Sequence, residues 1–181
     1  MIETQAVPYG LLRDRQHSTI DPARTSTVPG EILAQIALVE GDSAIRLVDR
    51  DVVSGAPSRI AALLLQELQL GPTDAERRRG LDSAVSAGLH LQVTGWHRGV
   101  LSVDVSGESN PAPDQLPLAV AQIVLTATSA PGVHSVMFQH GNTTVQVPLV
   151  DGSLTSAALT RQDYQKLLDS TPVPTASSQS R

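Results

Sequence analysis

The chain has 181 residues, a length that accommodates one domain with flanking tails, or at most two very small domains. Its 13 basic and 18 acidic side chains give a formal net charge of −5 with mixed signs, which excludes a broad basic face for nucleic acid. The absence of cysteine excludes disulfides, thiolate catalysis and cysteine-based metal sites.

Both ends of the chain differ in composition from its middle. Residues 1–30 carry prolines among Ser, Thr, Asp and Arg and show weak periodicity, so we expect an extended tether. Residues 171–181 are rich in Pro, Ser and Thr, and we expect them to be disordered. The folded domain is therefore predicted over residues 31–170. No stretch approaches the roughly 18 apolar residues of a membrane span, and "MIETQAVPYG" lacks a signal-peptide pattern.

The domain begins with the pattern of two strands followed by two helices. Apolar stretches on either side of residues 40–43 predict a β-hairpin with a tight turn. Apolar residues at i, i+3, i+4 and i+8 predict one face of a helix: Ile60, Leu63, Leu64 and Leu68. This helix should stop at Gly71. Thr73 and Glu76 then match a capping box, which predicts a second, short helix that ends at Gly80.

A second hairpin is predicted after these helices. Residues 89–94 and 101–105 alternate apolar and polar side chains, as expected for a sheet that helices cover on one side. The sequence Gly-Trp-His-Arg-Gly at residues 95–99 is interpreted as the turn, which places Trp96 in it.

Residues 116–127, "LPLAVAQIVLTA", predict a helix that is apolar around most of its circumference and is therefore central and buried. Asp114 is predicted to cap its N-terminus, and Pro117 is tolerated in the first turn. Because the chain has only four aromatic residues, its core must be assembled from many aliphatic side chains.

The remaining residues predict a strand over 133–139, a turn at 140–142, a strand over 143–149 and a short C-terminal helix. Thr160 and Asp163 resemble a capping box that opens this helix, which should run through Leu168. The fold class is therefore α+β, with an antiparallel or mixed sheet, two main helices packed on one face, and additional short helices.

The sequence holds no recognisable catalytic, cofactor-binding or metal-binding constellation. His134 and His140 share a strand parity, but six residues of strand separate them by about 20 Å, too far for one metal ion. There is no G-x-S-x-G elbow, and no glycine-rich phosphate loop follows a strand. Asp49 and Asp51 flank Arg50, where solvated carboxylates are commoner than an acid/base pair. We therefore predict no catalytic residue, no metal ligand and no cofactor.

Trp96 is the one candidate for a binding residue. It is the only tryptophan of the chain and lies beside His97 and Arg98. Two interpretations stay open. The indole packs over the sheet edge, or it is an exposed anchor for a partner, because Trp and Arg are enriched in interface hot spots.

The order of these segments resembles the GerMN domain family, named after a sporulation and spore germination protein. The matching segments are "AALLLQELQLGPT", "LSVDVSGE" and "LPLAVAQIVLTATSAPGVHSVMFQHGN". "VPYGLL", "EILAQIALVEGD" and "LTRQDYQKLL" are similar to actinobacterial members of the family. The match covers most of the chain.

The resemblance implies a secreted lipoprotein on the outer face of the cytoplasmic membrane, held by a lipidated cysteine. Because this sequence has no cysteine, such an anchor would lie upstream of it. The family is not known for a catalytic centre, and it is associated with envelope assembly, spore formation and, in one mycobacterial lipoprotein, modulation of a sensor kinase system. Its implied partners are an envelope protein or peptidoglycan.

These observations favour a non-enzymatic module of the cell envelope, active in assembly or signalling. One alternative is a cell-wall-modifying enzyme with an unrecognised active site, which requires a concave pocket that holds convergent ionisable side chains. A further alternative is a domain that binds a small ligand or lipid. It requires an open apolar cavity beneath the helix over residues 116–127.

Overall fold

A computed structural model describes residues 30–107 and 112–168 of the chain. The expected tether, apart from Gly30, and the expected disordered tail lie outside the described residues. The long elements are β1 (Glu31–Glu40), β2 (Ala44–Val53), α1 (Pro57–Leu70), β4 (Leu89–His97), β5 (Val100–Gly107), α3 (Leu116–Ala127) and β6 (Ser135–His140). The short elements are α2 (Asp74–Arg77), β3 (Leu81–Asp82), β7 (Thr143–Thr144), β8 (Val147–Pro148), β9 (Leu154–Thr155), β10 (Leu159–Thr160), η1 (Arg161–Tyr164) and α4 (Gln165–Leu168).

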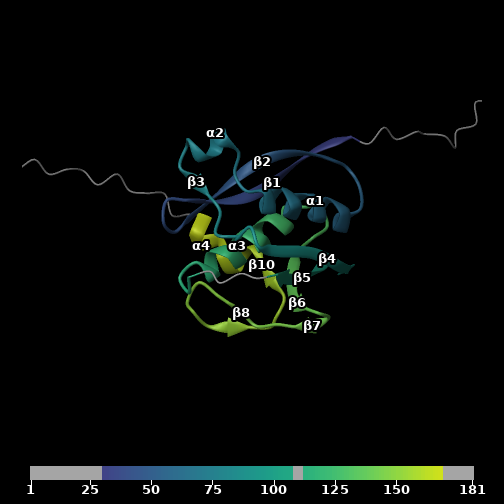
Figure 1. Cartoon of the computed structure of the whole chain (residues 1–181). Helices are drawn as coiled ribbons and strands as arrows, with labels where there is room; N and C mark the ends of the chain where they lie inside the picture. Colours follow the sequence, from purple (N-terminus) through teal and green to yellow (C-terminus); the bar gives the residue numbers. More distant parts are fainter. Residues whose placement is uncertain (1–29, 108–111, 169–181) are drawn as a thin grey trace, which may run out of the picture.

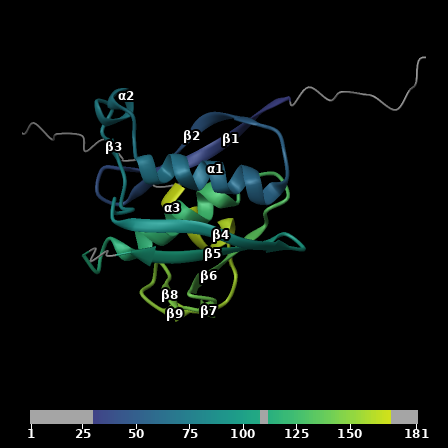
Figure 2. The same cartoon turned by 45° about the vertical axis from the view of Figure 1, so that its right-hand side comes forward.

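The described strands form two larger sheets and one small ribbon. The first sheet has the order β2-β1-β3, and the second has the order β10-β6-β5-β4 with β7 on β6. β5 and β6 are parallel and α3 connects them, so the second sheet is mixed, whereas the first is antiparallel. Figures 1 and 2 show α1 and α3 between the β1–β2 hairpin and the mixed sheet. The α+β class is confirmed, with the strands divided between sheets on both sides of the helices.

The first half of the domain forms the elements that its sequence predicts. β1 and β2 pair in one continuous register from Glu31–Val53 to Glu40–Ala44. α1 starts at Pro57, and Gly71 ends it at φ 78°, a backbone angle that favours glycine. Its buried face comprises Ile60, Ala61, Leu64, Leu65 and Leu68, whereas Leu63 of the predicted stripe is 38% exposed.

The capping box at the start of α2 is confirmed. The Thr73 hydroxyl accepts a hydrogen bond from the Glu76 N–H at 3.3 Å, and the Glu76 carboxylate accepts one from the Thr73 N–H at 2.8 Å. These two contacts satisfy backbone donors that the first turn of a helix leaves unpaired.

The second hairpin has a shorter turn than the sequence predicts. β4 continues through Trp96 and His97, which pair with Leu101 and Val100, so Trp96 lies in a strand and not in a turn. The loop comprises only Arg98 and Gly99, with φ values of 49° and 85°. Two consecutive positive φ values match the right-handed twist of a hairpin. Between Val93 and Gly95, β4 has one residue more than the paired part of β5, and this extra residue forms a β-bulge.

Helix α3 is buried almost all round, as predicted. Ten of its 12 residues are buried, and Pro117 lies in its first turn. The prediction that Asp114 caps it is wrong. The cap residue is Gln115, and it forms no side-chain capping hydrogen bond. The Gln115 N–H donates to the Ala112 carbonyl at 2.8 Å and closes a turn. Asp114 lies inside this turn and not at the cap position.

Three polar side chains attach the α3 segment to the edge of β1 that faces away from β2. The Ala37 N–H donates to the Thr126 hydroxyl at 2.9 Å, and Gln122 Nε2 donates to the Ala37 carbonyl at 2.8 Å. Ser129 Oγ accepts from the Gln35 N–H at 3.1 Å and donates to the Gln35 carbonyl at 2.6 Å. Gln122, Thr126 and Ser129 therefore replace the hydrogen bonds of a neighbouring strand.

The predicted strand over residues 143–149 does not form as one element. The turn through Gly141 and Asn142 leads to β7, which covers only the last two residues of β6. β10 occupies the same edge of β6 at Ser135 and Val136. Residues beyond Val145 therefore have no place along β6, and they form β8, which pairs with β9.

The C-terminal turn closes the core. Asp163 accepts hydrogen bonds from the N–H and the hydroxyl of Thr160 at 2.7 and 2.9 Å, as the predicted capping residue. The helix that follows is a 3₁₀ turn that continues as a short α-helix. Tyr164 is fully buried and donates its hydroxyl proton to the Pro148 carbonyl at 3.3 Å. None of the helices in the described ranges has the length and apolarity needed to cross a membrane.

We predict that Gln122→Leu strongly destabilises the domain. Gln122 is fully buried, and its amide also accepts the Ala84 N–H at 2.7 Å, so leucine leaves the buried Ala37 carbonyl and the partly buried Ala84 N–H without these partners. The expected loss is about 2–3 kcal/mol in the free energy of unfolding, measured by urea denaturation.

Gln66→Leu on the exposed face of α1 is the matched control, since it makes the same substitution on a helix without removing a buried hydrogen bond. It should shift the free energy of unfolding by about 0.5 kcal/mol or less. Equal losses in the two variants would contradict the proposed attachment of α3 to β1.

Candidate functional site

An apolar cavity of about 450 Å³ lies between the N-terminal half of α3, the mixed sheet and the segment around β8 and β9. Its walls come from the loop after β3, from β4, β5, α3 and β6, and from the segment around β8 and β9. The lining residues are Ala84, Ser86, Leu89, Val105, Pro113, Leu116, Pro117, Ala119, Val120, Ile123, Phe138, Val145, Gln146, Val147, Pro148, Gly152 and Leu154. The cavity lies beneath α3, where the small-ligand alternative requires one.

Helix α3 presents a regular stripe of side chains to this cavity. Leu116, Ala119, Val120 and Ile123 recur at i, i+3, i+4 and i+7, so they share one helical face. Phe138, the only phenylalanine of the chain, contributes to the opposite wall from β6. Leu116 and Leu154 are 39% and 62% exposed, so the apolar lining continues to the molecular surface.

The described lining of this cavity offers mainly apolar contact. None of the described residues that line it is Asp, Glu, His, Lys or Arg, and its polar side chains are those of Ser86 and Gln146. Acid–base catalysis needs a positioned proton donor or acceptor with a matched pKa. The cavity therefore offers a surface for binding and no group for proton transfer.

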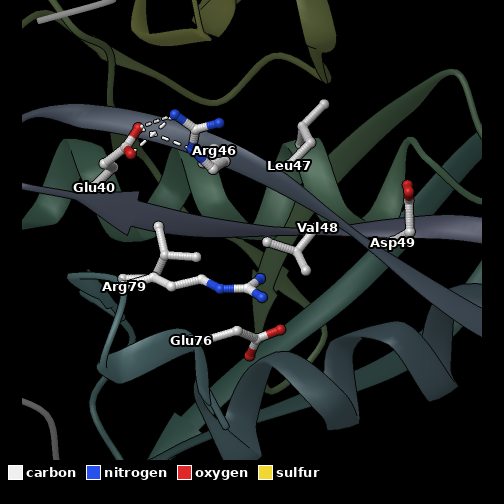
Figure 3. Close-up of a pocket in the computed structure, with 8 residues that line it drawn as sticks. Glu40, Arg46, Leu47, Val48, Asp49, Glu76 and Arg79 are labelled. Atoms are coloured by element: carbon white, nitrogen blue, oxygen red, sulfur yellow. Dashed lines mark hydrogen bonds and ion pairs between the residues drawn. The ribbon is translucent and has the colours of Figure 1, made fainter. Parts of the chain in front are cut away.

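A second hollow, of about 340 Å³, is charged and lies between β2 and α2 (Figure 3). Arg46 forms a bidentate pair with Glu40, with Nε and Nη2 each 2.9 Å from a carboxylate oxygen. Asp49 accepts a hydrogen bond from Gln35 Nε2 at 2.9 Å. Arg79 extends its exposed side chain across the groove toward Glu76. The carboxylates of Glu40 and Asp49 are thus already paired with protein groups.

Glu76 is the most buried ionisable residue of this groove, at 6% exposure. Its Oε1 lies 2.8 Å from Arg50 Nη1 and its Oε2 lies 3.0 Å from Arg50 Nη2, in addition to the bond from the Thr73 N–H. The hydrogen bond from Arg50 is the largest cause that lowers the pKa of Glu76 from its ordinary value of 4.5. A carboxylate stabilised in its charged form is a poor proton donor, so the geometry gives Glu76 a structural role.

Trp96 lies on β4, the edge strand of the mixed sheet, and 42% of it is exposed. Its indole N–H donates to the Gly132 carbonyl at 3.0 Å, which holds the ring against the turn before β6. The side chain is therefore both packed and accessible. Its role as a binding residue stays a prediction.

His134 directly precedes β6 and His140 ends it, so the strand separates these two histidines. His134 lies against Gly99, whose carbonyl accepts its backbone N–H at 2.7 Å, and His140 Nδ1 lies 2.7 Å from the Val105 carbonyl. Over residues 30–107 and 112–168, no three His, Asp or Glu side chains gather closely enough to hold a metal ion. Asp49 and Asp51 occupy β2 at the positions paired with Gln35 and Leu33.

The sequence model of one protein family matches residues 34–146 of the chain, and its description is sporulation and spore germination (Germane). This match spans most of the described domain. The chain belongs to the Germane family. The resemblance to GerMN domains drawn from the sequence is thereby confirmed. No curated protein matches the chain significantly.

Solved structures show the same fold at low sequence identity. The tandem GerMN domains of the sporulation protein GerM from Bacillus subtilis match with a TM-score of 0.57 and 16% identity. The match covers 74% of this chain and 48% of that one, so the chain spans about half of the tandem structure. The first GerMN domain of GerM alone gives a TM-score of 0.56 and 15% identity, over 72% and 98% of the chains.

A putative lipoprotein from Clostridium perfringens also matches, with a TM-score of 0.50 and 13% identity over 75% of this chain and 91% of that one. At such identities the likeness establishes the fold alone.

We predict that Glu76→Gln destabilises the domain in a pH-dependent manner. Removing the carboxylate deprives Arg50, whose side chain is 17% exposed, of its closest carboxylate partner, at an expected cost of about 3 kcal/mol at pH 7. The pKa of Glu76 is lowered by folding, so its stabilisation is complete above 4.5 and is lost as the pH falls through the folded-state pKa. Urea denaturation of both proteins between pH 7 and pH 3 should show their stabilities converge toward the acid end.

Glu67→Gln is the matched control, because Glu67 lies 4.0 Å from the same arginine with 48% of its side chain exposed. It should change the stability by less than about 0.5 kcal/mol at any pH. A pH-independent gap between wild type and Glu76→Gln would contradict the assignment of the ion pair.

Proposed function

We propose that this chain is a non-catalytic domain of the cell envelope that binds an envelope protein or peptidoglycan, in envelope assembly or signalling. The observation that carries the proposal is the apolar cavity, since no ionisable side chain is present among the described residues that line it. The charged groove adds to it, because Glu40 and Glu76 are already engaged by Arg46 and Arg50. An enzyme of the cell wall needs convergent ionisable groups that are available for catalysis, whereas the ionisable groups of the charged groove include carboxylates that arginines already hold.

An extracytoplasmic location is part of the same proposal. GerM is described as a sporulation protein, and the relative from Clostridium perfringens as a putative lipoprotein. By analogy with such relatives, we place the domain on the outer face of the cytoplasmic membrane, attached through a lipidated cysteine upstream of Met1. The location would allow the domain to contact both membrane proteins and the cell wall.

We further propose that the partner contacts the edge of the mixed sheet around Trp96. The indole is 42% exposed although its N–H is already bonded, so its ring is held in place before a partner arrives. A preordered aromatic side chain loses little conformational entropy on binding. His97 and Arg98, both exposed, add polar groups at the rim of this surface.

Photocrosslinking in the native envelope tests this proposal. Trp96→p-benzoylphenylalanine, in the membrane-attached protein, should crosslink to a defined envelope protein or to peptidoglycan. Leu70→p-benzoylphenylalanine is the control, because Leu70 is 69% exposed at the far end of α1, about 20 Å from its start beside Trp96. Equal crosslinking from both positions, or none, would show that the partner does not bind at the Trp96 surface.

Incubation with purified peptidoglycan sacculi distinguishes the proposed non-catalytic domain from the alternative, a cell-wall-modifying enzyme. The non-catalytic domain should release no soluble muropeptide, as measured by mass spectrometry. Reproducible release of muropeptides by the wild-type domain would overturn the proposal in favour of a cell-wall-modifying enzyme.

A further inference from the structure

We propose that the apolar cavity beneath α3 is a binding site for a single hydrocarbon chain, the acyl chain of a lipid with a neutral head group. The site is separate from the Trp96 surface, and the inference does not rest on the proposed function. It follows from the lining, the size, the fixed walls and the charges around the mouth of the cavity.

The lining selects an uncharged occupant. All described lining residues are uncharged, and apart from Ser86 and Gln146 their side chains are aliphatic, aromatic or absent. A buried charge without a partner is strongly disfavoured, whereas each buried methylene group adds a favourable transfer free energy. A charged head group would therefore remain outside while its chain enters.

The volume selects a flexible chain over a folded element. About 450 Å³ lies within the range of small-molecule sites, which is roughly 300–1,000 Å³. A single turn of helix, about 5 Å long and about 10 Å across, would fill nearly all of it. A linear hydrocarbon chain can thread between the walls.

The walls are held in place without a ligand. Gln122 and Thr126 fix α3 to β1, which sets the direction of the stripe that lines the cavity. On the other side, the buried Tyr164 hydroxyl bonds the Pro148 carbonyl, and β8 pairs with β9 through Pro148 and Leu154. Preformed walls lower the entropic cost of binding.

The mouth of the cavity favours a neutral head group. Leu116 and Leu154 continue the apolar lining to the surface, where a chain can enter. Two exposed carboxylates are adjacent in sequence to lining residues, Asp114 after Pro113 and Asp151 before Gly152. Like charges repel, so these aspartates disfavour an anionic head group at this position.

Displacement of the uncharged fluorescent probe N-phenyl-1-naphthylamine tests the site. Wild type should bind the probe saturably, and the neutral single-chain lipid 1-monolauroylglycerol should displace it, whereas glycerol should not. Dodecanoate, which carries the same chain on an anionic head, should displace it more weakly. Absence of saturable binding would overturn the site, and stronger displacement by dodecanoate would overturn the preference for a neutral head group.

A matched pair of variants locates the binding. Val147→Phe fills part of the cavity and should weaken displacement by monolauroylglycerol by about tenfold or more, because methylene groups are excluded. Val53→Phe makes the same change at a 55% exposed position on β2 and should leave the affinity within about twofold. Equal weakening in both variants would overturn the assignment.

Leu154→Gln provides a second variant that does not depend on tolerance of the core. Leu154 is 62% exposed, so glutamine should leave the melting temperature unchanged. It should still weaken binding several-fold, because the apolar mouth becomes polar. Unchanged affinity in Leu154→Gln would show that Leu154 is not part of the binding site. Unchanged affinity in a folded Val147→Phe variant would show that the lipid does not bind in the cavity.

Discussion

The contact between the α3 segment and the open edge of β1 is the interaction on which the rest of the structure depends. β1 pairs fully with β2 on one side, but on the other side β3 reaches only Val39 and Glu40. The backbone groups of Gln35 and Ala37 would be buried without partners, each at a cost of about 1–3 kcal/mol. Gln122, Thr126 and Ser129 supply those partners. A largely apolar helix can therefore stand where a strand would otherwise be required.

This attachment determines what the other faces of α3 do. Residues along a helix are rotated by about 100° each, so fixing Gln122 and Thr126 against β1 fixes the direction of every other side chain. One remaining face packs against α1. Another, with Leu116, Ala119, Val120 and Ile123, lines the cavity. The helix therefore faces β1, α1 and the cavity in turn, which explains why it is apolar nearly all round. Its few buried polar residues lie on the face that contacts β1.

The sequence indicated the elements better than their ends and their assembly. The β1–β2 hairpin, α1 and the capping box of α2 follow from local patterns that the fold leaves intact. The turn at residues 95–99 was placed too broadly because Arg98, an L-residue, adopts a positive φ that its identity does not announce. The strand over 143–149 fails for a non-local reason, since β7 and β10 share the edge of β6.

For the candidate sites too, the sequence indicated individual residues and helical faces but not how they assemble. The apolar surface of the 116–127 helix was predicted, but periodicity cannot tell a face that is covered from one that lines a hollow. Gln122 lies within this apolar segment, and its spacing to Thr126 and Ser129 at i+4 and i+7 is a readable signal of a polar stripe. Trp96 was found as the only tryptophan, but its hydrogen bond to Gly132 joins distant parts of the chain.

The scarcity of aromatic residues affects both the composition of the core and the presence of the apolar cavity. With one Phe, one Trp and two Tyr, bulk must come from branched aliphatic side chains, and two of the four aromatics are used elsewhere. Trp96 covers the turn at Gly132, and Tyr164 closes the C-terminal end. Among the described residues that line the cavity, Phe138 is the one aromatic, and small residues such as Ala119 and Gly152 also line it. A hollow whose described walls are mainly apolar distinguishes its contents chiefly by shape and apolarity, and the shortage of bulky aromatic side chains is one reason why the hollow is there.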